Sequence, residues 1–286
     1  MSFRSGSAVR LAALASVLVF SGAVFAGCSG SQAAAADSAQ EAFDRAQDAL
    51  TRRKFARAVE LFRTALDFGR TSDVADDAQL GLARAYVGTR EYLLAGAEFT
   101  RFIDLYRADP RVEEAAYERI LAYAALSPTY ELDQTDTATA IQYIDGFLTQ
   151  YPAGAHAADA QALLAGMREK LARKQYEEGR LYERRDLFEA SVLSFRGLLE
   201  TYPSSEYADD ALLGALRAQV RLADNSVPAR QEARYREALR LYEQLTSLFP
   251  TSPTLVEGQT FYDRAYRGAA SAAAATAALQ ATAPAQ

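Results

Sequence analysis

The stretch FEASVLSFRGLLETYP, residues 188–203, decides the fold of this chain. Its apolar and small side chains recur at offsets 0, 3, 4, 7, 10, 11 and 14, which places them on one face of an α-helix. They are Phe188, Ser191, Val192, Phe195, Leu198, Leu199 and Tyr202. A proline follows at once, and proline cannot continue a helix. The stretch therefore predicts an amphipathic helix that ends at an aromatic–proline pair.

The same pattern occurs four more times, beginning at Phe55, Tyr92, Thr137 and Tyr235. In every copy the second position is small, and a larger apolar side chain, usually aromatic, follows four residues later. The small residues are Ala58, Ala95, Ala140, Ser191 and Ala238. A small side chain lets a neighbouring helix approach closely while the larger one fills the gap. The five copies therefore predict the same helix packing five times.

Partner helices also repeat between these copies. The stretches VADDAQLGLARAYV (74–87) and YADDALLGALRAQV (207–220) match over most positions, and VEEAAYERILAYAAL (112–126) is a looser copy. Their acidic pairs suit the positive end of a helix dipole. Tandem helix pairs predict an all-α fold, an α-solenoid of about five pairs. The small-x-x-Tyr spacing of Gly179 and Tyr182 before Ser191 resembles the tetratricopeptide repeat.

The repeats are spaced more widely than the tetratricopeptide length of about 34 residues, which indicates insertions or long helices. Two insertions are predicted, at 127–136 and at 223–234. Each is either a specificity loop or a tolerated spacer. From His156 to about Arg184 the periodicity is continuous and predicts one long helix, which Gly166 and Gly179 could instead interrupt.

The amino terminus has the pattern of an export signal: a basic lead, an apolar run from Leu11 to Ala26, and then the chain's one cysteine, Cys28. Ordinary cleavage after Ala26 is one interpretation. The other is lipidation, because Phe25-Ala26-Gly27-Cys28 resembles a bacterial lipobox, whose thiol takes a diacylglycerol. We favour lipidation, since an unmodified lone thiol is a liability in an oxidising compartment. The predicted divisions are a signal peptide (1–27), lipidated cysteine and linker (28–37), units one to three (38–152), units four and five with the long helix (153–252), and a closing helix with an alanine-rich disordered tail (253–286).

Composition argues against several classes of function. The formal charge of −6 disfavours binding to nucleic acid or to anionic lipid. The chain has a single histidine, His156, and neither metal-ligand spacing nor a Gly-rich phosphate loop. We therefore predict no catalytic residues, no metal site and no cofactor other than the lipid on Cys28.

Three stretches carry a resemblance to a known family: LDQTDTATAIQYIDGFLTQYP (132–152), YEEGRLYERRDLFEASVLSFRGLLETYPSSEYADDALL (176–213) and ARYREALRLYEQLTSLFP (233–250). With the lipobox, they make the chain resemble the BamD family, outer-membrane protein assembly lipoproteins, in the form typical of Bacteroidetes and their relatives. The resemblance implies a lipid-anchored scaffold on the periplasmic side of the outer membrane. It also implies that the carboxyl-terminal units dock on the barrel-forming subunit's periplasmic repeat domains, and that the amino-terminal units receive unfolded outer-membrane proteins. The alternative is a periplasmic repeat adaptor that coordinates cell-wall or envelope processes.

The inner surface of a solenoid can hold an extended segment without catalysis. Under the resemblance, the candidate surface for such a segment lies on the first helices of units one and two. It comprises Phe43, Gln47, Arg84 and Tyr86. The competing interpretation of each residue is a core or solvated side chain.

Overall fold

The fold is known from a computed structural model that describes residues 36–69 and 71–281. Cys28 and the predicted signal peptide lie outside the described residues. Within them, all regular structure is α-helical. The helices are α1 (Ala39–Thr51), α2 (Phe55–Asp67), α3 (Ala75–Thr89), α4 (Tyr92–Leu105), α5 (Val112–Leu126), α6 (Thr135–Gln150), α7 (Ala157–Arg184), α8 (Phe188–Thr201), α9 (Ala208–Asp224), α10 (Pro228–Leu248) and α11 (Thr254–Ala281).

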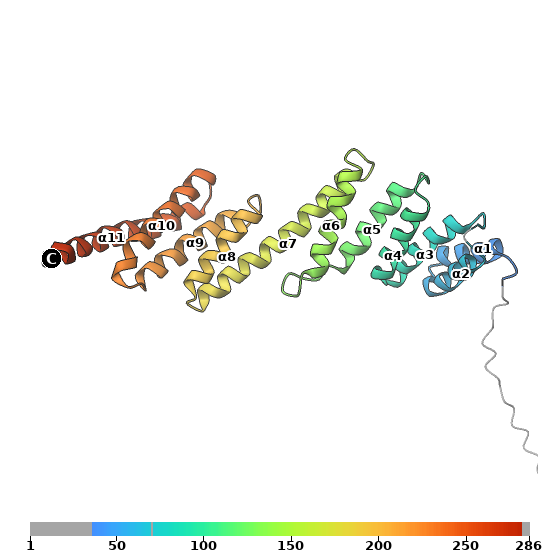
Figure 1. The fold of residues 1–286 in the computed structure, drawn as a ribbon, viewed down its shortest axis with the longest axis horizontal. Coiled ribbons are helices and arrows are strands. Elements are labelled where there is room, and N and C mark those ends of the chain that lie inside the picture. The colour runs from blue at the N-terminus through green and yellow to red at the C-terminus, as the bar shows by residue number, and fades with distance from the viewer. Residues whose placement is uncertain (1–35, 70, 282–286) are drawn as a thin grey trace, which may run out of the picture. The chain divides into compact units, whose positions relative to one another are not determined.

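Each helix packs against the next one in the chain, and α1, α7 and α9 also touch α3, α9 and α11, respectively. Figure 1 shows these successive helices as pairs, α1 with α2 through α9 with α10, followed by α11. The prediction of an all-α solenoid of tetratricopeptide-like pairs is confirmed. No helix among the described residues is long and apolar enough to cross a membrane.

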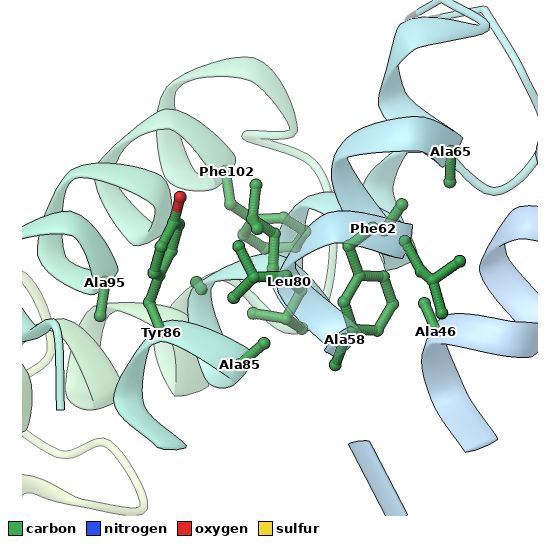
Figure 2. Packing of buried hydrophobic residues seen from close by; sticks show 14 of the residues in the cluster. Ala46, Ala58, Phe62, Ala65, Leu80, Ala85, Tyr86, Ala95 and Phe102 are labelled. Carbon is green, nitrogen blue, oxygen red and sulfur yellow. The ribbon is translucent and has the colours of Figure 1, made fainter. Parts of the chain in front are cut away.

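The small positions of the pattern lie where helices touch. Ala58, Ala95, Ala140, Ser191 and Ala238 are all 0% exposed. Figure 2 shows Ala46 and Ala58 beside the ring of Phe62 in the first core cluster. In unit four the ring of Phe195 fits between Gly179 and Gly214, where an added Cβ would lie 2.7 Å from the ring on either side. These close approaches explain why the pattern alternates small and large side chains.

Helix α7 runs for 28 residues without a break, as the periodicity predicts. Its first half supplies Ala160, Leu164 and Met167 to a core shared with α5 and α6. Its second half supplies Ala172 to the core of α8 to α11. Because α7 contributes side chains to two cores, it is a helix that units three and four share.

Two predictions are corrected. The second predicted insertion, 223–234, is largely helical, because α9 continues to Asp224 and α10 begins at Pro228. Proline suits a first helical position, where its missing N–H costs nothing. The alanine-rich tail is also helical as far as Ala281, since alanine has the highest helix propensity. The first insertion remains non-helical between Leu126 and Thr135.

Candidate functional site

Two of the four predicted surface residues belong to the first core. Tyr86 is 2% exposed, and its hydroxyl accepts a hydrogen bond from Arg63. Burial raises the pKa of Tyr86 above its usual value. Phe43 packs its ring 6.1 Å from that of Phe62. The Tyr86 side chain is therefore too buried to contact a bound segment, and Phe43 is partly buried against the same core.

The other two residues keep access to solvent. Gln47 is half-buried on α1, and Arg84 is half-buried on α3. The guanidinium of Arg84 is already paired, since it donates to both carboxylate oxygens of Glu118 and, at 2.8 Å, to Glu114 on α5. Arg84 thus links units two and three by ion pairs. Of the two residues, only Gln47 has a side chain that is not already paired with a described residue of another unit.

Another candidate site lies where the first insertion meets α7. We call it the loop groove, a cavity of about 580 Å³ between the insertion, α7 and the start of α9. Its lining residues are Thr129, Tyr130, Glu131, Gly166, Glu169, Lys170, Arg173, Glu206 and Tyr207. It draws on units three, four and five at once.

Cations of α7 hold the insertion in place. Lys170 Nζ donates to Ser127 Oγ at 2.6 Å. Lys174 Nζ donates to the backbone carbonyls of Tyr130 and Leu132 at 3.1 and 2.8 Å. The guanidinium of Arg173 lies over the Tyr130 ring, 4.2 Å from its centre. Hydrogen bonds and a cation–π contact therefore hold the insertion against α7.

These cations lack carboxylate partners. No carboxylate of the described residues lies within the 4.0 Å ion-pair distance of Lys170, Arg173 or Lys174, whereas Arg84 and Arg217 each pair with at least two. Burial lowers the pKa of Lys170. A cluster of unpaired cations in a chain of net charge −6 attracts acidic groups.

Three carboxylates also line the groove, those of Glu131, Glu169 and Glu206. The carboxylate of Glu169 accepts hydrogen bonds from Ser205 Oγ at 2.7 Å and from the Glu206 backbone at 3.2 Å. Nothing lies within 4 Å of a Cβ placed on Gly166, so α7 leaves space there. The groove therefore presents cations, carboxylates and the side chains of Tyr130 and Tyr207 to a bound group.

Sequence reasoning found the insertion but missed the role of α7. The signal was present in MREKLARK (167–174), whose cations at 170, 173 and 174 share one helix face. His156 stacks on Tyr117 with ring centres 4.1 Å apart. The described residues contain no group of His, Cys, Asp or Glu that could hold a metal ion.

Comparison with known proteins supports one family. The model of the YfiO family, described as outer membrane lipoprotein, matches residues 35–231. The outer membrane protein assembly factor BamD of Caulobacter vibrioides is 25% identical over 148 residues, which are 52% of this chain and 48% of that protein. The match thus spans about half the length of that curated relative.

Solved repeat proteins align with the chain at low sequence identity. A TPR repeats protein from Bacteroides fragilis aligns at 14% identity and a TM-score of 0.44, over 81% of this chain and 99% of its own. The TPR2AB domain of yeast Sti1 aligns at 15% identity and a TM-score of 0.36, over 80% of this chain and 98% of its own.

Proposed function

Because the chain belongs to the YfiO family of outer membrane lipoproteins, we propose that it is a non-catalytic scaffold of the outer-membrane β-barrel assembly machinery. In this proposal a lipid on Cys28 holds it on the periplasmic side of the outer membrane. Its partners are the barrel-forming assembly subunit, through that subunit's periplasmic repeat domains, and unfolded outer-membrane proteins awaiting insertion.

The observation that carries the proposal is the extent of the family match. Residues 35–231 include α1 to α9 and the start of α10. They also include every residue that lines the loop groove. The match therefore covers the candidate contact surfaces and not only the repeat pattern.

The loop groove suits the docking role. It joins the insertion of unit three to the start of unit five, so a domain seated there touches three units. Its unpaired cations attract an acidic patch and would raise the association rate as well as the affinity. The half-buried Gln47 remains a candidate contact for the incoming segment on the first helix of unit one, and Arg84 on the first helix of unit two could contact the segment only by giving up its bonds to Glu114 and Glu118.

Co-purification tests the assembly role. The intact lipoprotein is extracted from outer membranes in mild detergent, and its near-stoichiometric partners are identified by mass spectrometry. We expect a large β-barrel protein that carries periplasmic repeat domains. Recovery of cell-wall enzymes or envelope-division proteins in its place would move the function to the adaptor alternative.

A charge-reversed groove tests the contact surface separately. The double variant Arg173→Glu, Lys174→Glu should lose most of the barrel subunit, because Arg173 in the groove lining and Lys174 next to it both become acidic. The control is Arg236→Glu, Arg240→Glu on α10, which reverses the same number of charges at two arginines that pair only with neighbours on their own helix. Equal loss in both variants would contradict a specific role of the groove.

A further inference from the structure

A second cavity, of about 640 Å³, lies between α4, α5 and the end of α6. We call it the Arg119 cavity. It is lined by Ile103, Asp104, Arg107, Asp109, Pro110, Val112, Glu113, Arg119, Gln150 and Tyr151. It shares no lining residue with the loop groove, so it poses a separate question.

Arg119 is the unusual group in this cavity. Its Nε is fully buried and has no hydrogen-bond partner. Its guanidinium lies over the Tyr143 ring, 4.9 Å from the centre, and no carboxylate of the described residues lies within the 4.0 Å ion-pair distance. Burial lowers the pKa of Arg119. Arg119 as a whole is half-buried, and a guanidinium partly removed from water normally recovers hydrogen bonds from an oxyanion.

Other half-buried arginines of the chain show what is missing. Arg84 donates to two glutamates, and Arg217 pairs with Glu183 and Glu257. Arg111, next to this cavity, pairs with three aspartates. Arg119 has a comparable position between helices but lacks the carboxylate that these arginines have.

The carboxylates of the cavity are mostly committed elsewhere. Asp109 accepts hydrogen bonds from the Arg111 guanidinium and backbone, and Arg111 holds its pKa below the usual range. Glu113 accepts from the backbone N–H of Ala155 at 2.8 Å. Asp104 is exposed and lies beyond ion-pair distance of Arg119. Arg107 adds a second guanidinium to the lining.

We infer that the Arg119 cavity binds a carboxylate presented by a partner protein, either an acidic side chain or a chain end. The carboxylate forms an ion pair with the half-buried guanidinium of Arg119, which lines the cavity. Gln150 and Tyr151 provide further polar groups at the edge of the cavity. This inference does not depend on the assembly role, because it requires only the free guanidinium and the space in front of it.

The test observes Arg119 directly. Side-chain Nε–Hε resonances of the ¹⁵N-labelled intact lipoprotein in detergent are followed by NMR during titration with sodium acetate and, at matched ionic strength, sodium chloride. We expect a saturable shift of the Arg119 signal with acetate and none with chloride. The signal is assigned by its loss in Arg119→Gln.

Two peptides then distinguish the sources of the carboxylate. One carries an internal glutamate and an amidated end, and the other carries glutamine at that site and a free carboxyl terminus. Tighter binding of either identifies the source, and Arg119→Gln should weaken it by at least about tenfold. The Arg119→Lys variant keeps the charge and should bind more weakly than wild type, because lysine lacks the guanidinium fork.

An arginine that is paired at the surface provides the control variant. Arg168→Gln removes an arginine of α7 that pairs with Asp145 at 3.3 Å, and it should leave acetate binding unchanged. An Arg119 signal that acetate and both peptides leave unmoved would overturn the inference and indicate that ordered water alone satisfies Nε. A shift shared equally by the exposed arginines would overturn it as well.

Discussion

Arg84 of α3 and Arg217 of α9 occupy the same position in two helices of matching sequence, and each reaches forward to a glutamate on the next odd-numbered helix. The distances are 2.8 Å from Arg84 to Glu114 and 3.1 Å from Arg217 to Glu257. Arg217 also reaches back to Glu183 of α7. The same arginine position thus forms an ion pair with the following unit in two of the repeats.

Removing Arg217 should destabilise the carboxyl-terminal units. The Glu183 side chain is only 9% exposed, so Arg217→Ala leaves a nearly buried carboxylate without its main partner. Because breaking such a pair typically costs about 3 kcal/mol, we expect a loss of that order in the free energy of unfolding. Urea unfolding followed by circular dichroism at 222 nm measures it.

A surface pair and a rescue variant are the controls. Arg236 and Glu232 form an exposed pair within α10, and Arg236→Ala should cost less than about 0.5 kcal/mol. Adding Glu183→Gln to Arg217→Ala should recover part of the loss, because the unpaired charge is gone. Equal losses in Arg217→Ala and Arg236→Ala would show that burial of the pair has no energetic role.

Two glycine substitutions should have opposite effects. A Cβ on Gly214 would lie 2.7 Å from the Phe195 ring, so Gly214→Ala should destabilise the protein by about 1–2 kcal/mol through overpacking. Gly146 is exposed on α6 with nothing within 4 Å, so Gly146→Ala should stabilise by up to about 1 kcal/mol. Thermal unfolding of both variants tests this, and stabilisation by Gly214→Ala would contradict the packing at Phe195.

Alkaline pH should weaken the last units through Tyr235. Burial, with the hydrogen bond to Asp224, raises the pKa of Tyr235 from 10.0 to about 12. The neutral phenol is favoured in the folded state, so its contribution to stability is complete below pH 10 and is lost between about pH 10 and 12. Tyr235→Phe should show a smaller fall in unfolding free energy across that range.

Absorbance at 295 nm supplies the second readout, because it follows tyrosinate formation. Tyr235→Phe should remove one group that titrates near pH 12 and leave Tyr123, whose pKa burial also raises to about 12. An unchanged titration curve in Tyr235→Phe would contradict the shift.

The anchor prediction concerns a residue outside the described part of the chain. Cys28→Ala should release the protein from the membrane fraction, since two or three acyl chains would otherwise hold it stably. Helix content should not change, because the described helices do not involve this residue. Fractionation with circular dichroism of the released protein checks both points, and a variant that stays in the membrane fraction would argue against lipidation.

Helical periodicity was sufficient to predict the helix pairs, and in places their boundaries. Phe55, Tyr92 and Phe188 begin the repeated pattern, and each is the first residue of a helix. Local signals misled at 223–234, where Asn225, Ser226 and Pro228 read as a loop. The same Pro228 begins α10, and position alone separates the two meanings of proline.

The sites depended on contacts that local patterns do not contain. Lys174 holds the carbonyls of Tyr130 and Leu132 from more than 40 residues away. Tyr86 was a candidate for a surface because tyrosine suits both binding and packing, and only the approach of α2 and α4 assigns it to the core. How one unit packs on the next determines both the contacts of Lys174 and the burial of Tyr86.

The division of α7 between two cores limits how this array could have changed by descent. Repeat genes commonly grow and shrink by duplication or loss of whole modules, which needs a boundary where one module ends and the next begins. Between units three and four no such boundary exists, because Met167 and Ala172 of one helix belong to different cores. A recombination event within α7 would leave each of the two modules without the half-helix that completes its core. We therefore expect the length of α7 to be the same in relatives that keep this arrangement.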